Sequence, residues 1–441
     1  MRRAGHAVGA AALVLGLLAA LAAGQQPPQH VVVVVLDDVG IDKVGAYGHP
    51  TAGPTPVLDV LAATGLRFTS AYADPRCSPS RCAMLTGRYG SRTGIGSPVP
   101  VYDPASDPFL PAATEPWLPL QIPARSYLAG KWHLTHTADP DYHTDPLAKG
   151  FTWWRGHLVN PQLAQGEGLY SWKKQINGGE VTVSTFITTD NALEAWNALS
   201  ASAGQSSLVW LALQAAHPPW DEAPPAGLYT PVGGPQTQAK RQQYSLQAGD
   251  TLLGQLMLFY AQQLPTDFAT TIWIVLGDNG TPSQAIEAPE PPSHGKGTVY
   301  QGGVHVPLIV WGSGVTRGVT DELVHAVDVW ATVIDLFDVT RPSRPRSDSI
   351  SFAPVIVGGA GGRAVVYCRA HEPNGGGPYT LREHCATDGH WKLLEHTTGA
   401  PELYALDLDP YEQVDLWPPS TPAENAAVAL LQPVIDSSST P

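Results

Sequence analysis

The sequence predicts an α/β fold in which helices cover both faces of a large, mostly parallel sheet. Continuous apolar, β-branched runs at 31–36 and 270–276 are typical of strands that are buried on both faces. Helical patterns at 188–199 and 242–263 lie between such runs. Because strands and helices alternate along the chain, we expect parallel strands joined by crossover helices.

Composition excludes several classes of protein. The chain has 441 residues, which is enough for two to three domains or for one large core with a smaller appendage. Apolar residues make up 43% and charged residues 15%, which excludes disorder over most of the length. The 44 glycines and 42 prolines have no period, so they favour many ordered loops and exclude collagen. The formal net charge is −14 without any basic run, so we expect no nucleic-acid partner.

Residues 1–23 are predicted to be a secretory signal peptide. Two arginines near the start precede an apolar run at 7–23, and small residues then lead to polar glutamines. This layout is typical of a signal peptide that is cleaved near 22–24. A retained membrane anchor is the alternative, although the run has only marginal length for one. We therefore expect a secreted or periplasmic protein with no stable membrane insertion after cleavage.

The mature chain is predicted to have two parts. The catalytic α/β domain spans 24–342, and a smaller C-terminal α+β subdomain spans 343–441. In the second part, short strand patterns such as 364–368 and 390–394 alternate with Gly-rich turns. This texture favours a short antiparallel sheet.

Four cysteines are present, and in an exported chain an even number suggests disulfides. Cys368 and Cys385 lie near each other in a Gly-rich stretch and are a candidate pair. Cys77 and Cys82 are five residues apart at the start of a predicted helix, which is a poor geometry for a bond between them. Either these two have distant partners, or at least one has a chemical role.

Polar residues directly follow two of the predicted strands. Asp37 and Asp38 follow the first strand, and Asp278 and Asn279 follow the strand at 270–276. Ligands of open α/β sheets bind beyond the carboxyl ends of the strands. Three carboxylates and an amide oxygen gathered there would suit Ca²⁺ or Mg²⁺. Asp and Asn also form ordinary turns after strands, so neither pair alone establishes a metal site.

The segment 77–88 has the sequence Cys-Ser-Pro-Ser-Arg-Cys-Ala-Met-Leu-Thr-Gly-Arg. Pro79 suits the first turn of a helix and Gly87 its end. Cys77 then lies beside the helix N-terminus, where free N–H groups favour an anion, and Arg81 lies one turn further on the same face. The pattern favours a nucleophile that faces a bound oxyanion. The alternative is a half-buried structural cysteine.

Cys-x-Pro-x-Arg followed by Leu-Thr-Gly-Arg resembles the signature of the type I sulfatases, a family of the alkaline phosphatase superfamily. The match around Gly-Lys-Trp-His-Leu is close to a second signature of that family, and further short matches follow in the family's order. They lie at 37–40, 55–59, 65–68, 130–134, 216–219, 277–280, 295–297, 301–307 and 402–410. The segment 211–218 is most similar to the branch that contains arylsulfatase B, which acts on sulfated sugars.

The resemblance implies an alkaline phosphatase-like fold and a sulfuric ester hydrolase of arylsulfatase type. It implies that a formylglycine-generating or sulfatase-maturating enzyme converts Cys77 to formylglycine, whose hydrate attacks sulfur. It also implies a site for Ca²⁺ or Mg²⁺ formed by Asp37, Asp38, Cys77, Asp278 and Asn279.

The catalytic positions implied by the resemblance are Cys77, Arg81, Lys131, His133, His217 and Lys296. Lys131 and Lys296 would bind sulfate oxygens, and His217 would donate to the leaving oxygen. Arg81 would orient the hydrate. His133 would help remove the proton from the second hydroxyl, so that the aldehyde re-forms and sulfate leaves. Lys131 and His133 are two residues apart, so an extended segment would direct both to one face.

Four positions depart from the family pattern. Gln301 and His305 stand where many relatives have Glu and Arg, Gly277 replaces a usual Ser or Thr, and Cys82 replaces a small apolar residue. None of them is a proposed ligand or catalyst, so they bear on local geometry and substrate preference. His49, His136, His143 and His157 match no family role and are expected to be structural or substrate-facing.

The expected substrate is a sulfate ester, either of a sugar or of an aryl group. Two alternatives remain open at this point. One is hydrolysis of phosphate or phosphonate esters at the same kind of site. The other is a non-catalytic protein that binds sulfated glycans and retains an unmodified Cys77.

Overall fold

The computed structural model describes residues 30–339 and 347–438. The predicted signal peptide at 1–23 lies outside these residues. Within the two described ranges, no helix combines the length and the apolar character that crossing a bilayer requires.

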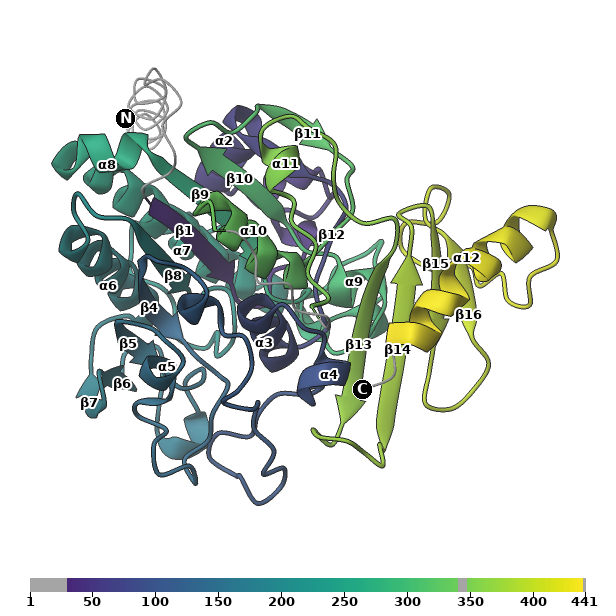
Figure 1. The fold of residues 1–441 in the computed structure, drawn as a ribbon, viewed down its shortest axis with the longest axis horizontal. Coiled ribbons are helices and arrows are strands. Elements are labelled where there is room, and N and C mark those ends of the chain that lie inside the picture. Colours follow the sequence, from purple (N-terminus) through teal and green to yellow (C-terminus); the bar gives the residue numbers. More distant parts are fainter. Residues whose placement is uncertain (1–29, 340–346, 439–441) are drawn as a thin grey trace.

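Ten strands form one large sheet, and its centre is parallel as predicted (Figure 1). β1 pairs in parallel with β8 and β9, and β8 and β5 both pair in parallel with β4. Antiparallel strands extend the sheet at both sides. In spatial order the strands are β11 (Gly318–Thr320), β2 (Leu66–Phe68), β10 (Leu308–Gly312), β9 (Thr271–Gly277), β1 (His30–Leu36), β8 (Ser207–Ala212), β4 (Arg125–Lys131), β5 (Trp153–His157), β6 (Trp172–Ile176) and β7 (Gly179–Val183).

Helices cover both faces of this sheet, as the alternating pattern predicts (Figure 1). Odd-numbered valines of β1 pack in one apolar core with α3 (Cys77–Thr86) and α10 (Val329–Leu336). Even-numbered valines of β1 pack in a second core with α2 (Pro56–Thr64), α6 (Ile187–Ala201) and α7 (Gln238–Gln263). Since β1 is buried on both faces, its continuous apolar run is explained.

Short helices and turns complete the connections. They are η1 (Ile41–Lys43), η2 (Gly45–Tyr47), α4 (Gly90–Thr93), η3 (Leu118–Leu120), α5 (Asp145–Ala148), η4 (Leu163–Gln165), α8 (Pro265–Ala269), η5 (Ser283–Ala285), η6 (Pro292–His294), α9 (Gln301–Val304), η7 (Ala326–Asp328) and α11 (Ala353–Ile356). A small parallel pair joins β3 (Ala71–Tyr72) to β12 (Val324–His325).

The C-terminal part has its own antiparallel sheet, in agreement with the sequence pattern (Figure 1). Its strands are β13 (Val366–Glu372), β14 (Leu381–Thr387), β15 (Trp391–Glu395) and β16 (Glu402–Ala405), and α12 (Pro422–Ser438) packs against them. Phe352 and Ile356, which precede this sheet, belong to the core of the large sheet. The predicted boundaries at 23 and 342 lie outside the described residues and stay predictions.

All four cysteines are buried free thiols in this structure. Cys368 and Cys385 are direct cross-strand partners on β13 and β14, so the candidate pair is adjacent but not bonded. Cys77 and Cys82 lie on α3 and are not joined, as their spacing predicted. Cys82 is part of the main apolar core, so it fills the place of the small apolar residue that it replaces.

Candidate active site

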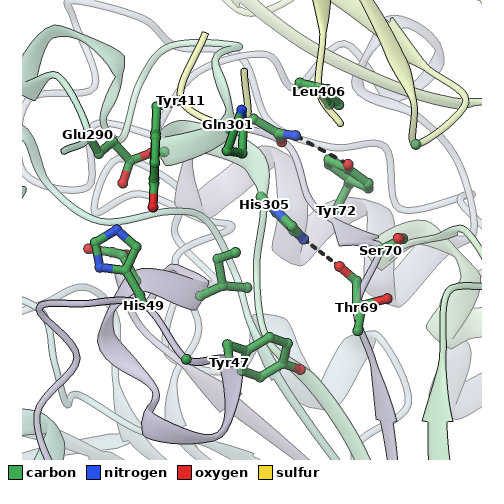
Figure 2. A pocket seen from close by; sticks show the side chains of 16 residues that line it. Tyr47, His49, Thr69, Ser70, Tyr72, Glu290, Gln301, His305, Leu406 and Tyr411 are labelled. Carbon is green, nitrogen blue, oxygen red and sulfur yellow. Dashed lines mark hydrogen bonds between the residues drawn. The ribbon is translucent and has the colours of Figure 1, made fainter. Parts of the chain in front are cut away.

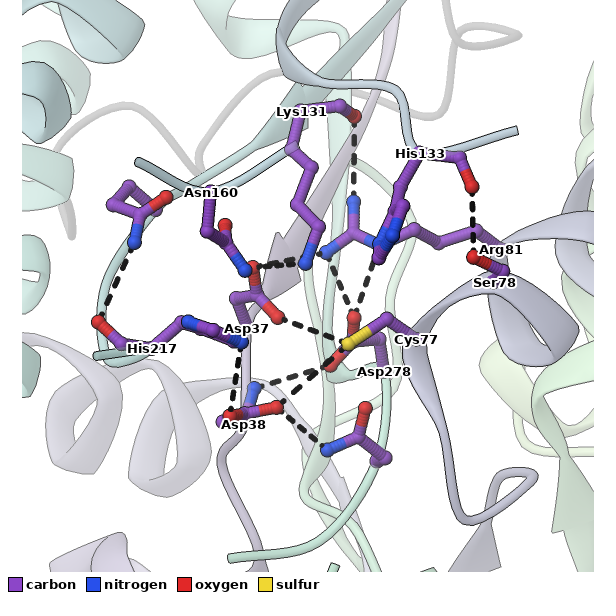
Figure 3. A network of polar contacts seen from close by, with 12 residues as sticks. Asp37, Asp38, Cys77, Ser78, Arg81, Lys131, His133, Asn160, His217 and Asp278 are labelled. Atoms are coloured by element: carbon purple, nitrogen blue, oxygen red, sulfur yellow. Dashed lines mark hydrogen bonds and ion pairs between the residues drawn. The ribbon is translucent and has the colours of Figure 1, made fainter. Parts of the chain in front are cut away.

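The structure brings the predicted site residues to the carboxyl edge of the central parallel strands, and Figure 3 labels all of them except Asn279 and Lys296. In the register, Val35 of β1 pairs with Ala212 of β8, and Leu36 pairs with Gly277 of β9. These strands therefore end at the same level, and the residues that follow them meet. The residues that lie together at this edge are Asp37, Asp38, Cys77, Arg81, Lys131, His133, His217, Asp278, Asn279 and Lys296.

The helix that contains the nucleophile candidate forms as its sequence predicts. α3 begins at Cys77, has Pro79 in its first turn, and ends at Gly87 in the left-handed conformation that glycine favours. Cys77 is only 2% exposed. Burial raises the pKa of its thiol to about 12, although Lys131 and Lys296 act in the opposite direction. An unmodified Cys77 is therefore a neutral thiol, which is a weak nucleophile.

Acidic side chains surround the Cys77 sulfur. Sγ lies 3.6 Å from Oδ1 of Asp37 and 3.9 Å from Oδ1 of Asp38. Together with His217, these three residues offer candidate ligand atoms that all lie within 4.8 Å of one another. Among the described residues, this is the cluster of His, Cys, Asp and Glu side chains with the spacing of a metal site.

Asp278 and Asn279 face the same space but are partly engaged. Asp278 Oδ1 accepts the Asp38 amide at 3.1 Å, and its Oδ2 accepts Arg81 Nη2 at 2.7 Å. Asn279 Nδ2 donates to Asp38 Oδ1 at 2.8 Å. Asn279 Oδ1 and Asp38 Oδ2 are buried without a hydrogen-bond partner. Buried oxygens without partners, next to further carboxylates, fit a hard divalent cation.

Three cationic side chains lie against the three carboxylates. Lys131 Nζ lies 2.7 Å from Asp37 Oδ2, and Lys296 Nζ lies 2.5 Å from Asp38 Oδ1. Burial alone raises the pKa of Asp37, but Lys131, His217 and Arg81 together hold it well below its usual range. The negative charges of Asp37, Asp38 and Asp278 equal in number the positive charges of Lys131, Lys296 and Arg81. The two positive charges of a bound divalent cation would then be neutralised by a monoanionic ester and an ionised nucleophile.

His133 reaches the site in a different way from the prediction. β4 ends at Lys131, and His133 has φ of 61°, so the segment is not extended and the alternation argument was wrong here. Both side chains still face the site because the backbone turns after the strand (Figure 3). His133 Nε2 bonds to the Val99 carbonyl at 3.2 Å, and burial followed by Lys131 and Arg81 lowers its pKa well below the usual value.

His217 lies on the opposite side of the cluster (Figure 3). Its Nδ1 donates to the Pro218 carbonyl at 2.6 Å, so Nε2 faces Asp38 Oδ2 at 3.5 Å. The side chain is 20% exposed, which leaves it open to a ligand. Burial lowers its pKa to about 4, while Asp38 raises it and Lys296 lowers it.

Three residues at the site were not foreseen. Ser78 Oγ donates to the His133 carbonyl at 2.8 Å and accepts the Val99 amide, which ties α3 to the loop after β4. Gln242 Nε2 donates to the Asp38 carbonyl at 2.8 Å. Asn160 is buried and points toward Asp37 in Figure 3. Ser78 stands inside the segment 77–88, whereas nothing in the sequence marks the other two.

Two glycines allow loops to approach closely at this edge. A Cβ on Gly130, which has φ of 102°, would lie 1.9 Å from the Ala212 carbonyl oxygen of β8. A Cβ on Gly277 would lie 2.3 Å from the Val39 carbonyl oxygen. Glycine at position 277, where relatives usually have Ser or Thr, is therefore explained by the backbone of Val39, which leaves no room for a side chain.

The family model described as Sulfatase matches residues 29–339. N-acetylgalactosamine-6-sulfatase of Rattus norvegicus is 30% identical over 382 residues, which cover 78% of this chain and 69% of that protein. Arylsulfatase A of Homo sapiens is 31% identical over 377 residues, which cover 78% of this chain and 71% of that protein.

Solved structures share the fold across almost the whole chain. The crystal structure of Ps i-CgsB has a TM-score of 0.75 at 24% identity and covers 94% of this chain and 93% of its own. The structure of BT4656 in complex with its substrate D-glucosamine-2-N,6-O-disulfate has a TM-score of 0.70 at 17% identity and covers 94% and 98%. At these identities, the likeness concerns the fold.

Proposed function

The chain belongs to the sulfatase family and is a sulfuric ester hydrolase, and from this premise we propose an exported enzyme that releases sulfate from a sulfated sugar. The observation on which the proposal rests is the meeting of Cys77, Lys131 and Lys296 with three carboxylates at one edge of the sheet. A sulfate ester is a compact anion, and such a site offers it cations beside a nucleophile position.

The names of the relatives support a sugar sulfate. N-acetylgalactosamine-6-sulfatase acts on a sulfated sugar by its name, and BT4656 was crystallised with a disulfated glucosamine. Arylsulfatase A supports an aryl sulfate as the alternative substrate, with a phenol as the leaving group. The arylsulfatase B-like branch, inferred from 211–218, stays a prediction. Export rests on the signal-peptide pattern at 1–23.

Because an unmodified Cys77 is a neutral, buried thiol and a weak nucleophile, its conversion to formylglycine would supply the nucleophile that the reaction needs. With a pKa of about 12, the thiol supplies almost no thiolate at neutral pH. Formylglycine at this position would supply a hydrated aldehyde, with one hydroxyl to attack sulfur and a second to release the product.

A divalent cation would be held by Asp37, Asp38, Asp278 and Asn279, together with the modified Cys77. Ca²⁺ and Mg²⁺ both suit such oxygen ligands. When bound, the cation would offset negative charge on the ester and on the nucleophilic oxygen.

The cationic side chains bind and orient the sulfate group. Lys296 Nζ lies 3.3 Å from Cys77 Sγ, so it faces the position where sulfur is attacked. Lys131 reaches the same space from β4. Arg81 holds Asp278 through Nε at 3.0 Å and Nη2 at 2.7 Å, which fixes the carboxylate beside the nucleophile.

Two histidines handle protons. His133 is neutral because its pKa is well below the usual value, so it can accept a proton from the second hydroxyl. His217 presents Nε2 to the substrate side. A bound anion raises its pKa from about 4, which favours donation to the leaving oxygen.

The decisive experiment is the mass of the tryptic peptide 77–81 from protein made in the native host. Formylglycine in place of the thiol supports the proposed chemistry. An intact thiol combined with tight glycan binding and no turnover would favour the non-catalytic binding protein instead.

Rates on an aryl sulfate and on the matching aryl phosphate separate the two ester classes. We expect the sulfate to be cleaved much faster. Much faster cleavage of the phosphate would contradict the proposed substrate class.

A further inference from the structure

A cavity of 270 Å³ lies away from the active site, between the segment 41–49, α9 and the loops of the C-terminal sheet (Figure 2). None of the predicted catalytic or metal-binding residues lines it. The lining residues include Gln301 and His305, at which the sequence departs from the family pattern. They also include His49, which matches no position with a known role in the family.

Aromatic rings form much of the cavity wall. Tyr47, Tyr72 and Tyr411 surround the space together with the rings of His49 and His305 (Figure 2). His305 stacks on Tyr72 with ring centroids 4.9 Å apart, and Tyr411 meets His49 edge to face at 5.8 Å. These contacts hold the rings in place, so their faces and edges are available to a ligand.

The cavity contains acidic and amide oxygens that lack hydrogen-bond partners, beside hydroxyl groups and the His49 ring, whose Nε2 is also without a partner. Glu290 is 6% exposed, and within the described part of the chain its carboxyl makes no hydrogen bond or ion pair, although the charges of Lys43 and Lys392 act on it from a greater distance. Gln301 Oε1 and Asp42 Oδ2 are buried and lack hydrogen-bond partners, although Asp42 also lies 3.3 Å from Lys43 Nζ. Among the residues lining the cavity there is no lysine or arginine. Buried acceptors without partners indicate a missing donor.

The geometry does not suit a metal ion. Among the described residues, the side chains that meet the spacing of a metal site are those of the active site, and no cavity residue belongs to that cluster. A ligand with several N–H donors spread over its surface suits the separated oxygens better. A positive charge also suits aromatic walls and an acidic lining.

We propose that this cavity binds a small organic ammonium ion, whose N–H groups donate to Glu290 and Gln301 Oε1 while its carbon frame lies between the rings of Tyr411, His49 and Tyr72. The site is separate from the hydrolysis of sulfate esters. Backbone hydrogen bonds nevertheless connect the cavity to the active site through Thr281. The Thr281 amide donates to the carbonyl of Gly302, a cavity residue, at 3.1 Å, and the amide of Lys296, an active-site residue, donates to the Thr281 carbonyl at 2.8 Å.

The protonation of Glu290 gives the proposal a second readout. Burial, followed by the charges of Asp42 and Glu412, raises the pKa of Glu290 to about 8. A bound cation favours the ionised carboxyl, so the affinity should increase by up to about tenfold per pH unit between pH 6 and 8. Burial lowers the pKa of His305 to about 4, so His305 stays neutral over this range, and burial also lowers the pKa of His49. The other charged or titratable groups that act on Glu290 or line its surroundings are Asp42, Lys43, His294, Lys392, Tyr411 and Glu412.

The test compares cyclohexylamine with cyclohexanol by isothermal titration calorimetry on the full mature protein at pH 8. The two probes share size and shape but differ in charge. We expect saturable binding of the amine with an affinity at least about tenfold higher than that of the alcohol. The reason is that only the ammonium group forms a charge-assisted hydrogen bond with the Glu290 carboxylate. Affinity should fall as the pH is lowered to 6.

Variants assign the binding to this cavity. Glu290→Gln should weaken the amine at least about tenfold, and Tyr411→Leu, a change at a partly exposed ring, should weaken it as well. The matched control is Glu287→Gln, which removes the same charge three residues away from a side chain that is 43% exposed. It should leave the affinity unchanged.

Three results would overturn the proposal. They are equal binding of amine and alcohol, tighter binding of an uncharged sugar such as glucose, or no saturable binding of any probe. Should Glu290→Gln fail to fold, unchanged amine affinity in Tyr411→Leu together with a flat pH profile would refute it equally.

Discussion

Replacing Lys296 with alanine isolates one electrostatic contact of the proposed chemistry. Its Nζ lies 3.3 Å from Cys77 Sγ, so the ammonium group lies beside the position from which the sulfate ester is attacked. Two unit charges at about 4 Å interact by about 4 kcal/mol at an effective dielectric constant of about 20. Because only part of a charge develops in the transition state, we expect kcat to fall by about 10² to 10³.

The fold should tolerate this change. The Lys296 side chain is 20% exposed, and Asp38 Oδ1 keeps the Asn279 amide donor at 2.8 Å after the ammonium group is lost. Thermal unfolding of the variant should therefore stay close to that of the parent. Lys173→Ala is the matched control, since this lysine is 42% exposed, forms an ion pair with Glu180 at 3.7 Å and lies over the Tyr102 ring at 5.7 Å.

Saturation kinetics with a chromogenic aryl sulfate provide the assay, on protein whose Cys77 peptide has been checked by mass. Lys296→Arg should recover part of the lost rate, because it keeps the charge but not the shape of the group. A change in kcat of less than about fivefold in Lys296→Ala would refute the contact between Lys296 and the transition state.

The remaining predictions address the nucleophile, the cation, a buried carboxyl and a strand end. Cys77→Ala should abolish turnover while circular dichroism and thermal unfolding stay near the parent; substantial residual turnover would refute the role of Cys77. Treatment with a chelator should remove turnover and lower Tm, since Asp37 and its neighbours lose a counter-charge, and Ca²⁺ or Mg²⁺ should restore both; full activity in excess chelator would argue against a metal. Burial raises the pKa of Asp250 to about 7, so the folded state retains a proton between about pH 4 and 7 that the unfolded state releases, and stability falls as pH rises through this window. Asp250→Asn should reduce the difference in unfolding free energy between pH 4.5 and 7.5, measured by urea unfolding, by up to about 4 kcal/mol. The same pH difference in parent and variant would contradict the buried proton. Gly130→Ala should cost more than about 3 kcal/mol of unfolding free energy, because its Cβ would lie 1.9 Å from a backbone oxygen, and an unchanged midpoint would show that the strands can separate.

The central fold could be predicted because its signal is local. A strand buried on both faces must be apolar throughout, and β1 and β9 each show such a run. The two polar pairs, Asp37 with Asp38 and Asp278 with Asn279, could likewise be placed at one edge, since residues that follow parallel strands meet there. The antiparallel sheet at the C-terminus was foreseen from its short strands and Gly-rich turns.

Other parts of the site depend on distant segments that no local pattern connects. Gln242 lies on α7 and reaches Asp38 across more than two hundred residues, and the position of Asn160 depends on the loop after β5. At the backbone turn of His133, the His133 amide donates to the Leu158 carbonyl at 2.7 Å, a contact with a distant segment that the local sequence does not reveal. The cavity beside Glu290 is lined by six separate stretches of the chain, so only the unusual residues at Gln301 and His305 hinted at it.

The position of Cys77 has a consequence for the biosynthesis of the protein. With its sulfur enclosed by Asp37, Asp38 and Lys296, the residue is closed to another macromolecule once α3 has packed. A maturation enzyme would therefore have to act on the nascent or unfolded chain, where the segment 77–88 is an exposed linear peptide. Folding and modification would then compete in time, and a molecule that folds first would be trapped as an inactive product that later contact with the maturation enzyme could not repair.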